Sequence, residues 1–463
     1  KMSESCGDGV SAPLPGRCGF FVDKKKRYCK MVVASGKTFC GEHAIAEKED
    51  GRKRIPCPLD PKHTVFEDNL AKHLKKCNSR EKPKPVYYVH DINAGVEEDM
   101  DMHEKEIALS SRSSEELDSL IMRLRAAVGE INCKHTEKIL SHPALLEALN
   151  DPKNGDFAVK HLKQQASLLG NLESLRLLGP DRCFVEFGAG KGKLSHWIDI
   201  ALQAAKNVHF LLVERATTRF KVDGKHKSPH SVFDRLQVDI QHLCLNKVPF
   251  LQEKKLPVVG VGKHLCGVAT DLALRCLVES CCSSGDSEEA GPPQKRLKSD
   301  PSDAESVGGS SESSTPLQVS GLAIALCCHH RCNWRHYVGR EFFIGLGLSA
   351  QDFRAFQRMS SWATCGLKKL GSDGPLSKEG SSEQDENLEK QHEYAGETTG
   401  DKFEGILPAE DRESIGRLCK LLIDEGRVDY LRRKGYAAEL QYYTSPDISL
   451  ENVLLTAVPV KTP

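Results

Sequence analysis

The chain has 463 residues, room for about three domains, and its 65 basic and 65 acidic residues give a formal net charge of zero. This balance excludes a protein coated with positive charge for general polyanion binding, so any contact with nucleic acid must come from local basic patches. Because no stretch approaches the roughly eighteen apolar residues of a membrane span and no signal pattern opens the chain, we expect an intracellular protein. It would lie in the nucleus or the cytoplasm, be neither secreted nor bound to a membrane, and show no sign of a protein partner.

Cysteine and histidine residues near the N-terminus are spaced as metal ligands. The chain contains 18 cysteines, and in the absence of a secretory signal such thiols favour metal ligation over disulfides. The first set has the pattern C-x10-C-x10-C-x2-H and consists of Cys18, Cys29, Cys40 and His43. Three thiolates and one imidazole complete a closed tetrahedral zinc shell, so we expect a structural CCCH zinc finger over residues 16–45.

A second set of ligands has the pattern C-x5-H-x9-H-x3-C and consists of Cys57, His63, His73 and Cys77. The last two are four residues apart on a helix expected over Phe66–Lys76, so both project from one face. Residues 54–80 are therefore predicted to form a CHHC finger, with one structural zinc ion in each finger. The alternative for both sets is chance cysteines in a disordered region, but too few apolar residues separate the ligands to build a core without metal.

Basic side chains in the two fingers are predicted to add affinity for RNA, in an interaction that weakens as salt rises. They are Lys24, Lys25, Lys26, Arg27, Lys72, Lys75 and Lys76.

Polar segments before Gly16 and over residues 78–112 are predicted to be a tail and a linker. A helical lead-in begins at Ser113, which can form a capping box with Glu116 ahead of apolar residues at helical spacing. Another helix is expected over Phe157–Leu169. It carries residues that form either a basic stripe or, as slightly favoured, a solvated face: Lys160, His161 and Lys163.

From residue 183 onward, apolar strand-like segments alternate with helical ones. The strands are expected at Cys183–Phe187, Val208–Val213, Arg235–Val238, Pro257–Val261, Leu322–Cys327, Gly435–Tyr443 and Asn452–Val458. Parallel strands with helical crossovers predict an α/β fold: a Rossmann-like, doubly wound and mostly parallel sheet covered on both faces. The last two strands, joined by a Ser-Pro-Asp turn, are predicted to form a terminal antiparallel hairpin. With its lead-in, this domain should span residues 113–463.

A glycine-rich loop follows the first of these strands, where residues 186–192 read E-F-G-A-G-K-G. Alternate glycines let the backbone turn sharply and approach a ligand, while the N–H groups of the next helix face an anionic group. The spacing differs from the dinucleotide pattern G-x-G-x-x-G and matches the pattern found in proteins that bind S-adenosylmethionine (SAM). In that pattern the leading acid faces the methionine end of the ligand. The candidate cofactor-binding residues are Glu186, Gly188, Gly190, Lys191 and Gly192.

The next two strands also end in an acidic residue. Glu214 can accept both ribose hydroxyls of a bound nucleoside, and Asp239, followed by Ile240, is suited to an adenine amino group. Each could be a plain strand-end carboxylate that faces solvent. Three such acids in βαβ order instead favour a SAM site, and a terminal hairpin is typical of SAM-dependent methyltransferases of this fold.

Two segments, at about residues 283–316 and 372–400, are dominated by Ser, Gly, Glu, Asp and Lys. They cannot bury enough apolar surface to offset the entropy of ordering, and are predicted to be disordered inserts. The first contains the basic run Gln294–Lys298, which is either a nuclear-import signal or a solvated run of charge.

Lysine, histidine and cysteine gather in two loops that follow the later strands, at Lys263–Gly267 and Cys327–Cys332. Ligands of an open α/β sheet bind outside the carboxyl ends of its strands, so these loops should face the SAM methyl group. A histidine there can take the proton from a hydroxyl acceptor, and a lysine can steady an oxyanion or a phosphate. The candidate catalytic residues are Lys263, His264, His329 and His330.

Other interpretations of the second loop remain open. Its cysteines and histidines could bind zinc, although adjacent cysteines rarely both turn toward one ion, or they could be core cysteines with a structural histidine. The motif N/D-P-P-Y/F, with which many methyltransferases grip an exocyclic amino group, does not follow the Pro257–Val261 strand. An oxygen acceptor is thereby favoured over a nucleobase amine.

Taken together, these motifs resemble the eukaryotic tRNA 2′-O-methyltransferase family that acts on the ribose of the fourth acceptor-stem nucleotide. The likeness runs from Arg17 to Val458 and includes both fingers, the E-F-G-A-G-K-G loop, and the K-H-L-C-G and C-C-H-H-R-C segments. The resemblance implies SAM as methyl donor and tRNA as acceptor and partner. The residues alone indicate a SAM-dependent methyltransferase with two zinc fingers.

Two alternatives accompany this interpretation. One is a nucleobase methyltransferase. The other is a zinc-finger RNA-binding protein with an inactive α/β domain, which the intact set of glycines and strand-end acids argues against.

Overall fold

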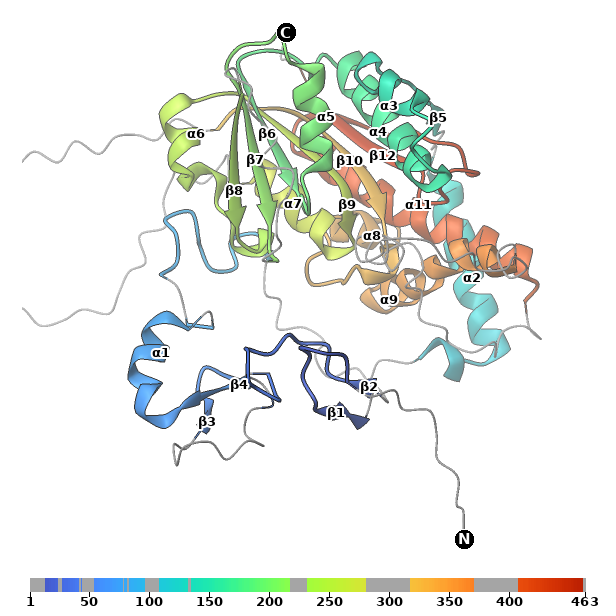
Figure 1. Cartoon of the computed structure of the whole chain (residues 1–463). Helices are drawn as coiled ribbons and strands as arrows, with labels where there is room; N and C mark the ends of the chain where they lie inside the picture. Colours follow the sequence, from blue (N-terminus) through green and yellow to red (C-terminus); the bar gives the residue numbers. More distant parts are fainter. Residues whose placement is uncertain are drawn as a thin grey trace, which may run out of the picture. The chain divides into compact units, whose positions relative to one another are not determined.

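The computed structural model describes residues 13–23, 27–40, 43, 54–77, 79–80, 83–95, 108–131, 135–216, 231–279, 317–369 and 407–460, apart from the side chains of Lys62, Ser110, His264 and residues 365–369. The chain divides into two compact units, Lys1–Pro85 and Val86–Pro463 (Figure 1). In the part of the chain that is described, no helix has the length and apolar character needed to cross a membrane.

The first unit contains two hairpins and one helix. Strand β1 (Phe21–Val22) pairs antiparallel with β2 (Arg27–Tyr28), and β3 (Arg54–Cys57) with β4 (Asp60–Phe66). A 3₁₀ turn then leads into α1 (Leu70–Lys76), which lies within the predicted helix. Besides four cysteines, Val65 is the sole buried hydrophobic residue among those described in this unit. Such a unit cannot be held together by an apolar core alone.

Eight strands form the central sheet of the second unit, in the spatial order β5-β11-β12-β10-β9-β6-β7-β8. Their bounds are β5 (Thr136–Glu137), β6 (Arg182–Phe187), β7 (Val208–Glu214), β8 (Ser231–Gln237), β9 (Val258–Cys266), β10 (Val319–Cys327), β11 (Tyr436–Tyr442) and β12 (Val453–Pro459). Strands β10, β9, β6, β7 and β8 are parallel neighbours in that order, while β12 runs antiparallel to both β10 and β11. The predicted α/β fold, with its mostly parallel sheet and terminal antiparallel hairpin, is confirmed.

Helices cover both faces of this sheet. Their bounds are α2 (Ser114–Glu130), α3 (Leu146–Asn150), α4 (Asp156–Ser174), α5 (Lys193–Ala201), α6 (Pro249–Lys254), α7 (Val268–Val278), α8 (Arg340–Gly345), α9 (Ala350–Met359) and α11 (Ala409–Arg433). Successive side chains of a strand face opposite sides. Accordingly Phe184 of β6 packs in the cluster that includes α4 and α5, whereas Val185 and Phe187 pack in the cluster that includes α7 and the second half of α11.

A third apolar cluster joins helices to one another rather than to the sheet. It contains α2, α8, α9 and the first half of α11, which gather beside the sheet in Figure 1. Aromatic side chains such as Tyr337 and Phe353, whose ring centroids lie 4.6 Å apart, fill its centre. Helix α2 starts at the capping box predicted for Ser113 and Glu116.

Three strands extend beyond their predicted bounds by three residues or more, and one of them is β10, which begins at Val319 instead of Leu322. Strand β8 begins at Ser231 instead of Arg235, because it lies at the edge of the sheet, where polar residues can alternate with apolar ones. Strand β9 continues to Cys266 instead of ending at Val261. Its polar end pairs with β10, with Leu265 opposite Leu326 and Cys266 opposite Cys327.

Part of the segment expected as a linker is packed against the second unit. The side-chain amide of Asn93 donates hydrogen bonds to the carbonyl oxygens of Ile240 at 2.6 Å and Leu243 at 2.8 Å. Arg275 of α7 donates to the Asn93 carbonyl at 3.0 Å. We name residues 86–95 the strap. Hydrogen bonds of Asn93 hold this polar segment beside the turn that follows β8.

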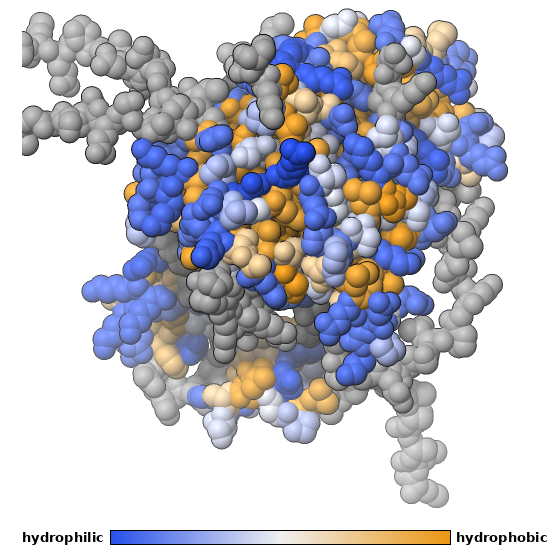
Figure 2. Space-filling view, turned by 90° about the horizontal axis from the view of Figure 1, so that it is seen from above, coloured by the Kyte–Doolittle hydropathy of each residue, from blue (hydrophilic) through white to orange (hydrophobic). Residues whose placement is uncertain are grey.

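Hydrophilic residues cover much of the surface seen in Figure 2, with hydrophobic residues in patches between them. Both predicted inserts, the basic run Gln294–Lys298 and the side chains of Lys24 to Lys26 lie outside the described residues.

Candidate functional site

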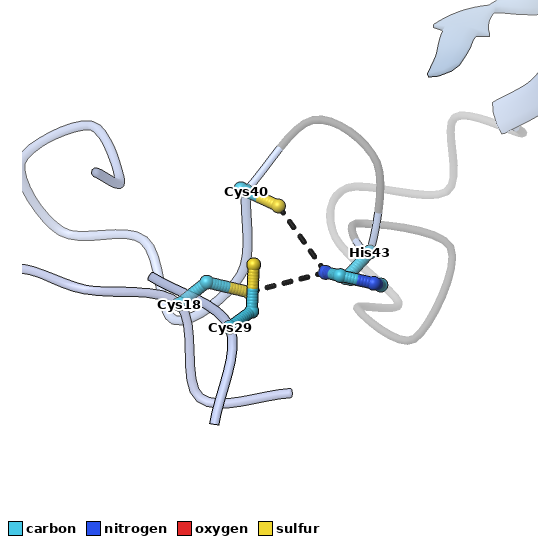
Figure 3. Close-up of side chains that lie close together, drawn as sticks. All are labelled: Cys18, Cys29, Cys40 and His43. Carbon is cyan, nitrogen blue, oxygen red and sulfur yellow. Dashed lines mark hydrogen bonds between the residues drawn. The ribbon is translucent and has the colours of Figure 1, made fainter. Parts of the chain in front are cut away.

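The four predicted ligands of the CCCH finger converge (Figure 3). Nδ1 of His43 lies 3.5 Å from Sγ of Cys18 and 3.3 Å from Sγ of Cys40, and all four ligand atoms lie within 4.8 Å of one another. Burial alone would raise the pKa of Cys18, but hydrogen bonds from the backbone of Cys40 and Phe20 lower it. A thiol that ionises readily is what zinc requires, so this donor set fits the ion.

The CHHC ligands converge in the same way. The turn between β3 and β4 brings Cys57 and His63 to the end of α1, where Sγ of Cys57 lies 3.8 Å from Sγ of Cys77. Nε2 of His73 is 3.2 Å from Cys57 Sγ and 3.0 Å from Nε2 of His63. Asp60 lies 3.5 Å from Nδ1 of His63, the outer contact that commonly orients a zinc-bound histidine. This set therefore also fits a tetrahedral zinc ion.

Four of the finger residues predicted to bind RNA have described side chains, and all four are exposed. They are Arg27 of β2 and Lys72, Lys75 and Lys76 of α1.

The glycine-rich loop connects β6 to α5. Gly188, Gly190 and Gly192 have φ angles of 61°, 48° and 74°, in the left-handed region that favours glycine. A Cβ at Gly192 would lie 2.6 Å from a methyl group of Leu212, whereas one at Gly190 would meet nothing within 4 Å. The space beside Cα of Gly190 is therefore open, and the half-buried Lys191 follows it.

The strand-end acids lie near this loop. Glu214 accepts hydrogen bonds from the N–H groups of Gly190 at 3.0 Å and Ala216 at 2.9 Å. Asp239 accepts one from the N–H of Gln241 at 3.1 Å, and Arg215 lies 3.4 Å from its other oxygen. Ile240, next to it, is buried. The parallel order of β6, β7 and β8 thus brings the loop, Glu214 and Asp239 together along one edge.

Glu186, at the end of β6, is buried beneath the glycine-rich loop. Its buried carboxylate accepts hydrogen bonds from the backbone N–H and the hydroxyl of Ser195, in the first turn of α5. Burial raises its pKa to about 7, although the bonds from Ser195 act to lower it. Glu186 therefore holds the start of α5 against the end of β6. Because the glycine-rich loop connects these two elements, the same contact holds both ends of the loop in place.

A cleft with about 760 Å³ of open space, including solvent at its mouth, lies at the carboxyl ends of β9 and β10. It collects side chains from distant parts of the chain: Gln164 of α4, Lys263 and Cys266 of β9, Cys327 at the end of β10, Cys328 to His330 after it, Lys420 of α11, and Glu451 before β12. Three of the four predicted catalytic residues line it. The side chain of the fourth, His264, lies outside the described residues.

His329 is held by a buried acid. Its Nε2 lies 2.8 Å from both carboxylate oxygens of Asp424, which also accepts a hydrogen bond from Arg427 at 2.9 Å. Burial alone would raise the pKa of Asp424, but His329 and Arg427 outweigh it and lower this pKa. Nδ1 of His329 is buried and has no hydrogen-bond partner among the described residues. A carboxylate at Nε2 favours the tautomer in which Nδ1 keeps its lone pair.

The other cleft residues differ from His329 in their partners. Nζ of the buried Lys263 lies 3.1 Å from Nδ1 of His161, which is itself buried. The prediction that His161 lies on a solvated face is therefore wrong. Its neighbours Lys160 and Lys163 are exposed, as predicted. Burial lowers the pKa of His330, and its Nε2 has no hydrogen-bond partner in the described structure.

Sequence reasoning missed the residues that position this site: Ser195, Asp424 and Arg427. The sequence carries a signal for the last two, because an acid and an arginine three positions apart interrupt an apolar stretch of α11. In the structure both side chains are almost fully buried. Arg427 also pairs with the buried Asp271 at 2.8 Å.

Comparison with known proteins agrees with this arrangement. Residues 163–458 match the family model described as "Methyltransferase TRM13", residues 16–44 match "CCCH zinc finger in TRM13 protein", and residues 54–78 match "U11-48K-like CHHC zinc finger". No solved structure matches the chain.

Relatives cover nearly the whole length. A Mus musculus protein named "tRNA:m(4)X modification enzyme TRM13 homolog" is 61% identical over 97% of this chain and 96% of its own length. The Homo sapiens protein of that name is 59% identical over 96% and 95%, and the Yarrowia lipolytica "tRNA:m(4)X modification enzyme TRM13" is 31% identical over 95% and 89%. Because the family model spans residues 163–458 and the relatives match nearly the whole chain, the chain belongs to the TRM13 methyltransferase family.

Proposed function

We propose that the protein transfers a methyl group from SAM to the ribose 2′-hydroxyl of the fourth nucleotide in a tRNA acceptor stem. The observation that carries this proposal is the cleft beside the glycine-rich edge, into which the chain brings His329 with its Nε2 held by Asp424. The relatives' printed name, a tRNA modification enzyme, supports tRNA as the substrate. The fourth position follows from the family resemblance of the motifs.

The glycine-rich edge supports SAM as the donor. The space beside Cα of Gly190 is open to a ligand, and Glu214 lies at the end of the next strand, where it can accept hydrogen bonds from ribose hydroxyls. Bound SAM would supply the methyl group. The loop would hold its polar parts so that the methyl group faces the cleft.

His329 would be the general base. Methyl transfer to a hydroxyl requires the oxygen to lose its proton, and the lone pair on Nδ1 can accept it. The positive charge that forms on the ring would be stabilised by the ionised Asp424 at Nε2. Lys263, which lines the same cleft, would position a phosphate or steady the developing negative charge.

A ribose acceptor also suits a double-stranded stem. The 2′-hydroxyls of an A-form helix line its wide and shallow minor groove, so an enzyme reaches them without extruding a base. The basic residues of the fingers would add electrostatic affinity for the phosphate backbone.

The decisive substrate is a tRNA that carries a single 2′-deoxy nucleotide at the fourth position. We expect mass spectrometry of its nucleosides to show no methylation there, while the unmodified tRNA gains a 2′-O-methyl group. Methylation of the deoxy substrate at that nucleotide would instead identify a nucleobase methyltransferase. Loss of all methylation with retained tRNA binding would indicate an inactive RNA-binding protein.

A further inference from the structure

Three thiols meet at the carboxyl ends of β9 and β10, in the wall of the cleft. Cys266 ends β9 and Cys327 ends β10, and the two are direct partners in the parallel pairing of these strands. Their Sγ atoms are 3.6 Å apart, and Sγ of Cys328 completes a group in which all three sulfurs lie within 4.8 Å of one another. The proposed methyl transfer uses none of these thiols.

The backbone at Cys328 makes this convergence possible. Adjacent residues of a strand point to opposite faces, which is why neighbouring cysteines rarely bind one ion. Cys328 leaves the strand with φ 51° and ψ 45°, a left-handed conformation that is costly for a residue with a side chain. This conformation turns its thiol back toward Cys266 and Cys327.

The spacing of the sulfurs fits a tetrahedral zinc site. A Zn–S distance of about 2.3 Å places two thiolates about 3.8 Å apart. In the CHHC finger the two cysteine sulfurs are 3.8 Å apart, and in the cleft Cys266 and Cys327 are 3.6 Å apart. The same chain therefore repeats, in its α/β unit, the sulfur spacing of its own zinc finger.

We propose that Cys266, Cys327 and Cys328 form a third metal site, which binds a thiophilic divalent cation such as Zn²⁺. Three protein ligands leave the fourth position open toward the cleft, as in zinc sites that accept a water or a substrate. His330 also lines the cleft. The ion would tie the ends of β9 and β10 to the loop that carries His329.

Zinc content tests this site without any substrate, and therefore independently of the proposed reaction. We expect elemental analysis of the full-length protein to give three zinc ions per chain, one for each cluster of ligands. Cys266→Ser, Cys327→Ser and Cys328→Ser should each lose one ion. The matched control is Cys419→Ser, which changes a buried thiol outside the cluster and should keep all three. Two ions in the unaltered protein, or three in the cluster variants, would overturn the proposal.

Thiol protection tests the site in the unaltered protein, should a variant fail to fold. We expect Cys266, Cys327 and Cys328 to resist alkylation until a chelator is added, with or without a reductant. Protection that a reductant alone removes would identify a disulfide between two of these cysteines. Immediate alkylation of all three would show free thiols, and either result would contradict a metal site.

Discussion

His329 and Asp424 form the buried pair on which the proposed proton transfer depends, with Nε2 of the ring 2.8 Å from the carboxylate. We expect His329→Ala to lower the single-turnover rate of tRNA methylation by about 10² to 10⁴-fold, the usual share of a general base. SAM affinity measured by calorimetry should stay unchanged, because His329 lies in the cleft and not in the glycine-rich loop. His90→Ala, on a side chain that is 71% exposed, is the control. An unchanged rate in His329→Ala would remove this residue from the reaction.

Gly190 tests the cofactor site. Gly190→Val places a side chain in the open space beside the backbone, so we expect SAM affinity to fall by at least about tenfold, or 1.4 kcal/mol. Gly347→Val is a matched control, since Gly347 also has a positive φ, 70°, and open space around its Cβ. Both variants carry the same kind of backbone strain. Equal SAM affinity in the two variants would place the ligand elsewhere.

Glu186 should make stability depend on pH in a predictable direction. Its pKa rises from 4.5 to about 7 on folding, so between these values the folded state holds a proton that the unfolded state has released. The free energy of unfolding therefore falls as pH rises from about 4.5 to 7, by an amount of the order of 3 kcal/mol. Glu186→Gln cannot ionise and should not show this loss. Urea unfolding of both proteins at pH 5 and pH 8 measures it, and parallel pH profiles would contradict the assignment.

At the scale of secondary structure, the apolar runs predicted the bounds of β6 and β7 to within one residue, because these strands are buried on both faces. The end of β10 was predicted as well, but the strand begins three residues earlier, at Val319. The same reasoning could not find the two-residue β5, which is defined by pairing with β11 rather than by its own composition. The convergence of Cys266 with Cys328 was equally hidden, since it depends on strand register and on one left-handed residue. The gathering of Lys263 and His329 at the carboxyl edge of the sheet was predicted, although residues 263–266 extend β9 instead of forming a loop. The partner of His329 came from α11, 95 residues further along.

The strap shows how a short segment can support a distant loop. Asn93 donates to two buried carbonyl groups in the turn that follows Asp239, so Asn93→Ala leaves both without this partner. We expect the free energy of unfolding to fall by about 1 to 3 kcal/mol. His90→Ala, in the same segment, should change it by less than about 0.5 kcal/mol. Urea denaturation compares the two, and equal stability would show that the strap contributes little.

At the scale of the whole molecule, the balanced net charge leaves tRNA affinity to local patches. Lys72, Lys75 and Lys76 are exposed on α1, next to a zinc site that holds this helix in place. If all three contact phosphates, replacing them by glutamine removes three of the counterion-releasing contacts. The slope of log affinity against log salt concentration should then become less steep by about 2 to 3, at about 0.7 to 0.9 for each contact.

The control for the lost net charge replaces three exposed lysines of the second unit by glutamine. They are Lys247, Lys254 and Lys255. Titrations of tRNA binding at several salt concentrations, with zinc content checked for each variant, compare the two proteins. We expect the control to keep the slope of the unaltered protein, because the basic residues of the fingers remain. Equal slopes in the finger variant and the unaltered protein would assign tRNA binding to the α/β unit alone, and the fingers would then serve another purpose.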